Sequence, residues 1–292
     1  MKVLSEDKRS MKYGSVFAIQ DSLSKFFLTQ PIDTLCLFDE SCTQNYLNSF
    51  DNWIKSTKNN SIIDLDKFGY KCFSHGSAQS FDKFYLNNPL KRFRCFRGEY
   101  LYHQLAWRDR YNWQYLEDDK LKNGDAVVIS LPFADTGNKH INYDSLMQQC
   151  CDLNIPVLVD CAYFGVCSNI AFDFSFECIT DITFSLSKTF PISHARAGIR
   201  YTKQDTDDTL FVYQKIDYVN RLSESIALRF LNNISSDYIS SKYKNQQIEL
   251  CKNLGIEPSN TVMIGIDTKN LFPEYNRGGT TNRLSLDRLF KE

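Results

Sequence analysis

Residues 184–188, with the sequence FSLSK, are the most informative stretch of this 292-residue chain, and residues 195–198, with the sequence ARAG, follow soon after. Lys188 stands just past a β-branched, apolar run beside hydroxyl side chains, and Arg196 precedes a small residue and a glycine. A single lysine or arginine is most often a surface charge. In this setting the pair is typical of a Schiff-base lysine beside a phosphate site, at the end of a buried strand.

Short apolar runs alternate with helical patterns on both sides of this stretch, and such alternation is the signature of an α/β sheet. Residues 126–129 (AVVI) and 157–159 (VLV) are apolar without interruption, which suits strands buried on both faces. We therefore predict an α/β fold. Strands are expected at residues 70–74, 92–96, 126–131, 156–160, 182–186, 197–202 and 261–266, with a further one at 282–286.

Helical patterns fill the intervals between the expected strands. One begins after Gly76 and runs to about residue 87. Another follows Asn142 or Asp144, either of which can act as an N-cap, and ends near residue 152. Apolar residues at roughly helical spacing predict one long helix over residues 209–232, and residues 236–254 form the last expected helix. The part of the chain before about residue 71 gives the weakest pattern.

The turn that opens the helix after Gly76 is a candidate anion site. Ser77, Ala78 and Gln79 occupy its first turn, where backbone N–H groups have no partner within the helix. Such amides, together with the Ser77 hydroxyl, can bind a phosphate group. An ordinary strand-to-helix turn is the alternative interpretation.

Two strand ends carry side chains that suit a flat, nitrogen-containing ring. Tyr100 follows the strand at residues 92–96, where an aromatic can stack on a ligand ring, although packing is its commoner role. Asp160 ends a buried strand, and Tyr163 follows it. Ligands of open α/β sheets bind beyond the carboxyl ends of strands, so the Asp160 carboxylate can hold a protonated pyridine nitrogen. A helix N-cap or a solvated loop acid is the alternative.

In chain order, these features are a phosphate-binding turn, a stacking aromatic, a strand-end aspartate, and the lysine segment with its arginine. This order resembles the aminotransferase superfamily of pyridoxal-phosphate enzymes (class I/II, fold type I) over residues 70–203. The resemblance implies pyridoxal 5′-phosphate as the cofactor. It implies that Lys188 forms the aldimine and transfers protons, that Asp160 pairs with the pyridinium nitrogen, and that Tyr163 binds the phenolic oxygen. Ring stacking is then the role of Tyr100, and phosphate binding that of Ser77, Ala78, Gln79, Ser185, Ser187 and Arg196.

The resemblance also implies an architecture and a reaction. Residues 71–232 are expected to form a large three-layer α/β/α cofactor-binding domain around a mostly parallel mixed sheet. Residues 233–292 then form a reduced small α+β domain, and residues 1–70 an N-terminal segment that packs partly with it. The implied reaction transfers an amino group between an amino acid and a 2-keto acid. A lyase or decarboxylase on the same fold, and a non-catalytic binding or regulatory relative, are the alternatives. A homodimer is implied, with Tyr13 as a candidate to reach across the subunit boundary.

Residues 131–137 (LPFADTG) look like the Asn-Pro-Thr-Gly segment of these enzymes, with two departures. Ala134, counted with the substrate-binding residues, stands where they have Asn, and Asp135 stands where they have Pro. Ala134 removes an amide donor to the phenolate oxygen, so the Schiff base is expected to titrate at a higher pH. Arg283, in the expected strand at residues 282–286, is the candidate for binding the substrate carboxylate. Its rivals are Arg277 and Arg288.

Bulk composition excludes several classes of partner. The formal net charge of −1 gives no case for nucleic acid or an anionic membrane as a partner. Neither a run of about 18 apolar residues, which a membrane span needs, nor a secretory leader is recognisable in the sequence. The 10 cysteines and 4 histidines lack the spacing of metal ligands. Reduced thiols in a cytoplasmic protein without a metal are therefore expected.

Overall fold

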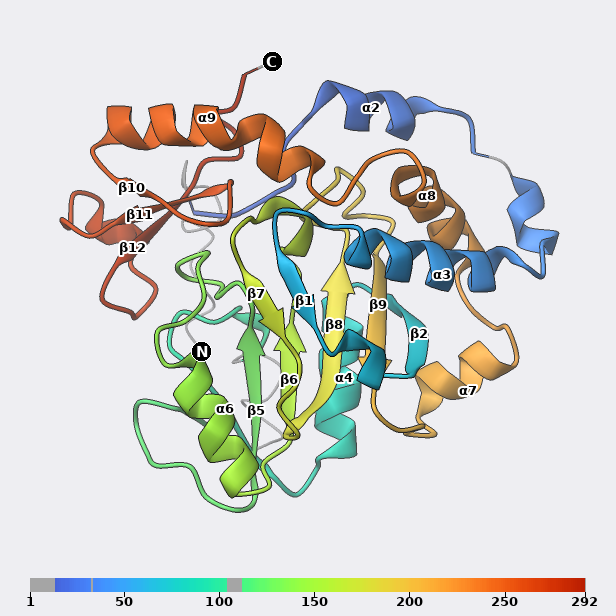
Figure 1. Cartoon of the computed structure of the whole chain (residues 1–292), viewed down its shortest axis with the longest axis horizontal. Helices are drawn as coiled ribbons and strands as arrows, with labels where there is room; N and C mark the ends of the chain where they lie inside the picture. The colour runs from blue at the N-terminus through green and yellow to red at the C-terminus, as the bar shows by residue number, and fades with distance from the viewer. Residues whose placement is uncertain (1–13, 33, 104–111, 292) are drawn as a thin grey trace.

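The computed structural model describes residues 14–32, 34–103 and 112–291. Its largest sheet contains, in spatial order, β2 (Tyr70–His75), β9 (Ala197–Thr202), β8 (Ile179–Ser185), β6 (Val157–Asp160), β5 (Asp125–Ser130), β3 (Arg92–Cys95) and β4 (Trp113–Tyr115) (Figure 1). β9 runs antiparallel to both of its neighbours, and the other pairs are parallel. The prediction of a mostly parallel mixed sheet is therefore confirmed.

Helices cover both faces of this sheet, because successive residues of a strand point to opposite sides. Ala126 and Val128 of β5 pack with the aromatic residues of α4 (Ser77–Asn87) on one face. Val127 and Ile129 belong to the main core on the other face. The helices that contribute to that core are α3 (Cys42–Lys55), α6 (Tyr143–Asp152) and α8 (Arg221–Leu231). The predicted three-layer α/β/α arrangement is thus the observed one.

The predicted single helix over residues 209–232 is wrong. The chain forms α7 (Thr209–Lys215) and then α8, with a break between them. Asp217 in the break has a φ of 56°, a left-handed conformation that an α-helix cannot contain. Asn220 then caps α8, because its side chain accepts a hydrogen bond from the Ser223 amide at 3.0 Å. The apolar spacing therefore predicted each of the two helices correctly, but it gave no sign of the turn between them.

The last part of the chain forms a smaller unit beside the sheet. It consists of α9 (Tyr238–Leu254), followed by the antiparallel strands β10 (Glu257–Pro258), β11 (Ile264–Asp267) and β12 (Asn282–Ser285) (Figure 1). Gln247 of α9 ties the helix to the strands, because its buried amide donates to the carbonyls of Ser259, Thr261 and Ile264. This unit carries Arg277 and Arg283.

Residues 14–21, here called the N-terminal strap, lie along this smaller unit before α2 (Ser22–Thr29) begins. Val16 and Ile19 are buried in a core that they share with α9 and β11. Asp21 is fully buried and accepts hydrogen bonds from Lys242 at 2.6 Å and Tyr243 at 2.9 Å, both on α9. The strap is therefore held by apolar packing and by an ion pair whose acidic partner is buried.

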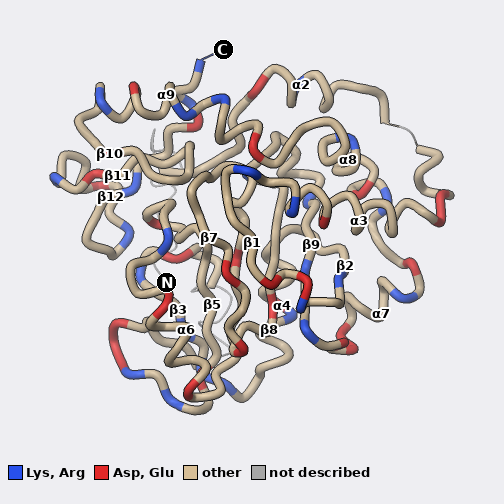
Figure 2. Tube along the Cα trace, viewed as in Figure 1, with Lys and Arg blue, Asp and Glu red and all other residues tan. Residues whose placement is uncertain are grey.

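Several short elements escaped the sequence patterns. β1 (Ser61–Ile63) pairs in parallel with β7 (Ala171–Asp173), outside the large sheet. The 3₁₀ helices are η1 (Thr34–Phe38), η2 (Leu65–Lys67), η3 (Phe164–Val166) and η4 (Pro273–Tyr275). Acidic and basic residues are interspersed along the trace (Figure 2). Among the described residues, none of the helices has the length and apolar character needed to cross a bilayer.

Candidate functional site

One edge of the large sheet gathers most of the residues singled out from the sequence. β2, β3, β5, β6 and β8 run in the same direction, so their carboxyl ends meet at this edge. β9 runs the opposite way, which brings its amino end to the same place. The loops that leave the edge carry Gly76, Glu99, Ala134 and Lys188. Arg196, immediately before β9, joins them from the other direction.

The start of α4 has the form of an anion cradle. Its N-cap, Gly76, has a φ of 69° and a ψ of −179°, which only glycine adopts readily, and no described side chain caps the helix. The first-turn amides of Ser77, Ala78 and Gln79 therefore point outward without an intrahelical acceptor. The Ser77 hydroxyl is buried, and no residue in the described part of the chain forms a hydrogen bond with it. The Gln79 side chain does not face this space, because it accepts a hydrogen bond from the His75 amide at 2.8 Å.

A guanidinium group lies directly over this cradle. Arg196 Nη2 donates to the His75 carbonyl at 3.1 Å, and a Cβ at Gly76 would lie 2.5 Å from the same nitrogen. Gly198 makes the close approach of β9 possible, because a Cβ there would lie 3.0 Å from the Gly76 Cα. Ser185 pairs with Gly198 across the sheet. The structure thus brings Arg196, Ser185 and the start of α4 together around one small volume.

The lysine segment continues from Ser185 into this volume. The Ser185 and Ser187 hydroxyls lie 3.1 Å apart. Lys188 Nζ donates to the Val16 carbonyl of the N-terminal strap at 2.6 Å. Burial lowers the pKa of Lys188 to about 8, and the positive charges of Arg283 and Arg196 contribute to the shift. A lysine amine with this pKa is partly neutral at neutral pH, as a nucleophile or general base requires.

Asp160 ends β6 beside the cradle and is buried. The Ala162 amide donates to its Oδ1 at 3.1 Å. Burial raises the pKa of Asp160 to about 6, and the nearby Ser77 hydroxyl (although not in hydrogen-bond geometry), the Ala162 amide and the Lys188 charge partly oppose that rise. The carboxyl group is therefore ionised at pH 7 and can accept a hydrogen bond from a cationic ligand nitrogen.

Glu99 is a buried acid at this edge to which the sequence analysis gave no role. Its two oxygens accept hydrogen bonds from the Ser130 amide at 2.7 Å and from the Ser130 hydroxyl at 2.6 Å. Ser130 is in turn the register partner of Asp160 in the sheet. Burial raises the pKa of Glu99 to about 7, and the negative charge of Asp160 adds to the effect. Its position beside Tyr100 was visible in the sequence, but its burial was not.

The two predicted tyrosines differ in their surroundings. Tyr163 is buried, and burial raises its pKa while the charges of Arg283 and Arg277 lower it. Tyr100 is 48% exposed, and its ring lies nearly parallel to that of Tyr102, with centroids 6.1 Å apart. Both tyrosines lie at the same edge of the sheet, and a stacking role for Tyr100 stays a prediction. Tyr13 lies outside the described residues.

Two arginines converge on the backbone of Ala134. Arg283 Nη1 and Arg277 Nη1 each donate to the Ala134 carbonyl at 3.1 Å. The buried Arg283 also donates to the Gly14 carbonyl at 2.8 Å, and within residues 14–32, 34–103 and 112–291 its Nε has no hydrogen-bond partner. Arg288, the other rival, is exposed and lies over the Phe17 ring at 5.3 Å. Arg277 and Arg283 therefore lie together at the Ala134 carbonyl, whereas the sequence could not show which of the three arginines would do so.

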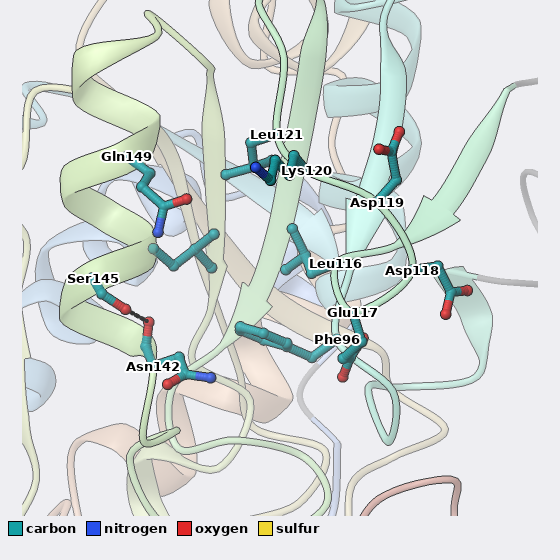
Figure 3. A pocket seen from close by; sticks show the side chains of 11 residues that line it. Phe96, Leu116, Glu117, Asp118, Asp119, Lys120, Leu121, Asn142, Ser145 and Gln149 are labelled. Atoms are coloured by element: carbon teal, nitrogen blue, oxygen red, sulfur yellow. Dashed lines mark hydrogen bonds between the residues drawn. The ribbon is translucent and has the colours of Figure 1, made fainter.

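Two cavities in the described part of the chain lie away from Lys188. One of about 920 Å³ lies between α6 and the loop from β4 to β5 (Figure 3), and its lining includes Phe96, Leu116 and Gln149. A second cavity, of about 320 Å³, is lined by His75 and Gln79 together with residues of α7 and the break that follows it. None of the lysine, acid or arginine side chains described above lines either cavity. Among the described residues, no group of three or more His, Cys, Asp or Glu side chains is arranged to hold a metal ion.

No family model matches this sequence, and no curated protein matches it. Solved structures do match its fold. An aminotransferase from Staphylococcus aureus aligns with a TM-score of 0.62 at 13% identity, covering 94% of this chain and 88% of that one. The PLP-bound C-S lyase from Staphylococcus hominis aligns with a TM-score of 0.62 at 13% identity, over 84% of this chain and 78% of the lyase. L-threonine-O-3-phosphate decarboxylase from Porphyromonas gingivalis aligns with a TM-score of 0.62 at 12% identity, over 94% and 97% of the two chains.

These likenesses establish the fold of this chain. It is the fold of the PLP-dependent, aminotransferase-like proteins, as the resemblance in the sequence predicted. Aminotransferase, lyase and decarboxylase neighbours align about equally well, so the fold alone does not select a reaction.

Proposed function

We propose that this chain is a PLP-dependent aminotransferase that moves an amino group between an amino acid and a 2-keto acid. The observation that carries the proposal is the grouping of Lys188, Asp160 and the α4 cradle at one edge of the sheet. Each of these features suits a different part of one cofactor, namely its aldehyde, its pyridine nitrogen and its phosphate.

The residues present fit pyridoxal 5′-phosphate. The unpartnered, buried Ser77 hydroxyl and the first-turn amides of α4 offer donors for a phosphate, and Arg196 offers a positive charge above them. Ser185 and Ser187 would complete the set of hydrogen-bond donors around the phosphate group. Asp160 would hold the ring nitrogen, Tyr163 the phenolic oxygen and Tyr100 a ring face. Lys188 would carry the cofactor covalently.

When bound, the cofactor supplies an electron sink for the carbon atom that loses its proton. The chain's own side chains do the rest. Lys188, with a pKa of about 8, takes a proton at Nζ and returns it. Asp160 stays ionised at neutral pH, which keeps a proton on the ring nitrogen opposite it. Arg283 orients the substrate by binding its carboxylate with a guanidinium fork.

Two further parts of the proposal rest on the resemblance. The chain is proposed to act on small-molecule amino acids and keto acids as a homodimer, and residues 71–232 and 233–292 are proposed as its large and small domains. Because a C-S lyase and a decarboxylase share the fold, β-elimination or decarboxylation is the second candidate reaction.

The test begins with the purified chain incubated with pyridoxal 5′-phosphate. We expect visible absorbance, and after borohydride reduction a pyridoxyl adduct on Lys188 in the peptide map. Lys188→Ala abolishes the adduct, whereas Lys252→Ala, at an exposed lysine, leaves it unchanged. An adduct on another lysine, or none, contradicts the site assignment.

The reaction is then tested with a panel of amino acids. Transamination yields a 2-keto acid and leaves the cofactor as pyridoxamine phosphate, and a second keto acid reverses the change. Release of ammonia or of a decarboxylated amine, without pyridoxamine phosphate, identifies the lyase or decarboxylase instead. Light scattering of the loaded protein tests the homodimer.

A further inference from the structure

Asp135 is a buried carboxylate with an unused acceptor. It is 3% exposed, and its Oδ1 has no hydrogen-bond partner among the described residues. The nearest charged partner is Arg277, whose Nη1 lies 3.9 Å from that oxygen, beyond hydrogen-bond distance. Gly98, with a φ of 87°, packs directly on the carboxyl group, because a Cβ there would lie 2.7 Å from the Asp135 Cβ. A buried acceptor without a donor is costly, so this oxygen is suited to a donor from a ligand.

The charges around Asp135 define what that ligand can be. Arg277 and Arg283 bring two positive charges to the Ala134 carbonyl, and Asp135 brings one negative charge beside them. One substrate carboxylate, bound by Arg283, neutralises the remaining positive charge. The pair of Asp135 and Arg277 is then neutral overall. It still offers a carboxylate oxygen as acceptor and guanidinium N–H groups as donors.

We propose that Asp135 and Arg277 form the side-chain subsite of this enzyme, and that the subsite selects amino acids whose side chain ends in a carboxamide. The inference rests on the proposed function and names its substrate class. A carboxamide has an NH₂ group that can donate to Asp135 Oδ1 and a carbonyl that can accept from Arg277. A hydroxyl group can also donate and accept, but it does so through a single oxygen, whereas a carboxamide offers a separate, adjacent atom to each of the two partners, whose polar atoms lie 3.9 Å apart.

Each competing class of substrate leaves this subsite unsatisfied in its own way. A second carboxylate faces the Asp135 charge, and a side-chain ammonium group faces Arg277. An alkyl side chain buries both polar groups without partners. A site built to hydrogen-bond a substrate rejects the analogue that lacks the group, because its own buried polar atoms are left unpaired.

The test compares matched substrates on the cofactor-loaded protein. Single-turnover conversion to pyridoxamine phosphate is followed with glutamine, asparagine, glutamate, aspartate, ornithine and leucine. We expect a carboxamide substrate to exceed its isosteric acid, ornithine and leucine by at least about tenfold in kcat/KM. Calorimetry with succinamate and succinate, which lack an amino group, gives the same order of binding without any chemistry.

Asp135→Asn provides the decisive variant. It removes the negative charge and leaves Arg277 unneutralised, so the order of glutamine and glutamate is expected to reverse. Asp144→Asn, the same change at an exposed carboxyl group, leaves the order as it was. Arg277→Gln serves as the second variant and loses the carboxamide preference. The wild-type protein alone can overturn the proposal: it does so if the kcat/KM for an acidic, basic or apolar amino acid equals or exceeds the values for both glutamine and asparagine.

The two proposals fail separately. A protein that takes up no cofactor on Lys188 contradicts the proposed function. A protein that takes up the cofactor and converts other amino acids at least as fast as the amides contradicts only the carboxamide subsite.

Discussion

The amine of Lys188 lies 2.6 Å from the carbonyl oxygen of Val16, a residue 172 positions away in the chain. The contact joins the proposed covalent attachment point to the N-terminal strap. Arg283 makes a similar contact, because its Nη2 donates to the Gly14 carbonyl at 2.8 Å. The strap thus supplies backbone acceptors to two cations of the site, and their positions depend on how firmly the strap is held.

Cofactor capture is expected to follow the ionisation of Lys188. Only the neutral amine attacks an aldehyde, and burial with nearby positive charge gives this lysine a pKa of about 8. The rate of absorbance change on mixing cofactor-free protein with pyridoxal phosphate should therefore rise with pH and level off above about pH 8.

Arg283→Gln tests the cause of that shift. Removing this positive charge raises the pKa of Lys188, so the midpoint of the rate profile moves to higher pH. Arg288→Gln, at an exposed arginine that is not among the main causes of the shift, moves the midpoint less than Arg283→Gln does. Equal midpoints in all three proteins show that Arg283 does not act on Lys188.

The α4 cradle is expected to recognise the phosphate and nothing else of the cofactor. Ser77→Ala and Arg196→Gln each remove a donor, and each is expected to weaken pyridoxal phosphate binding roughly tenfold to a hundredfold. Pyridoxal, which has no phosphate, serves as the internal control and should bind all three proteins equally. Equal weakening for both vitamers means that the variants damage the fold and not a phosphate site.

The parts of the site that the sequence predicted are those set by local pattern. The turn at Gly76 and the strand end at Asp160 follow from a change in periodicity and from the residue types at that point. Lys188 follows strand β8 and Arg196 precedes the antiparallel strand β9, so the sheet topology brings both residues to the same edge.

The parts that the sequence missed depend on contacts between distant residues. Glu99 matters because it is buried against Ser130, and nothing near it in the chain reports that burial. Arg277 and Ala134 are 143 positions apart in the chain, so the sequence could not show their contact. Three arginines therefore remained candidates for binding the substrate carboxylate. The break at Asp217 is a single backbone conformation inside a run whose apolar spacing stays helical on both sides.

Asp21 is expected to anchor the strap in a pH-dependent way. Burial raises the pKa of Asp21, but hydrogen bonds from Lys242, Ser24 and Tyr243 outweigh it and leave the pKa below its ordinary value. A depressed pKa means that this stabilisation is complete above the unfolded-state pKa of about 4 and is lost as the pH falls further.

Asp21→Asn is therefore expected to lower the free energy of unfolding by about 1–3 kcal/mol at pH 7. The difference between variant and wild type should shrink below about pH 4. Urea unfolding at several pH values measures it, with Asp144→Asn, at an exposed acid, as the matched control. A difference that is constant with pH indicates that packing, and not the Asp21 charge, holds the strap.

Glu99 is expected to show the opposite dependence on pH. Burial gives this carboxyl group a pKa of about 7 in the folded chain, whereas an unfolded glutamate ionises near 4.3. Between these values the folded state holds more protons than the unfolded state, so stability falls as the pH rises. The loss over this window is on the order of 3 kcal/mol.

Glu99→Gln removes this ionisation, although its NH₂ group then faces either the Ser130 amide or the Tyr100 amide, which lowers stability at every pH. Asp160 adds a slope of the same sign up to about pH 6. Glu99→Gln retains that contribution, so subtracting the variant's profile from that of the wild type isolates Glu99. The difference should decline between about pH 4.3 and pH 7 and stay level above. Parallel profiles across this range contradict a raised pKa for Glu99 and leave its role as a hydrogen-bond acceptor for Ser130 alone.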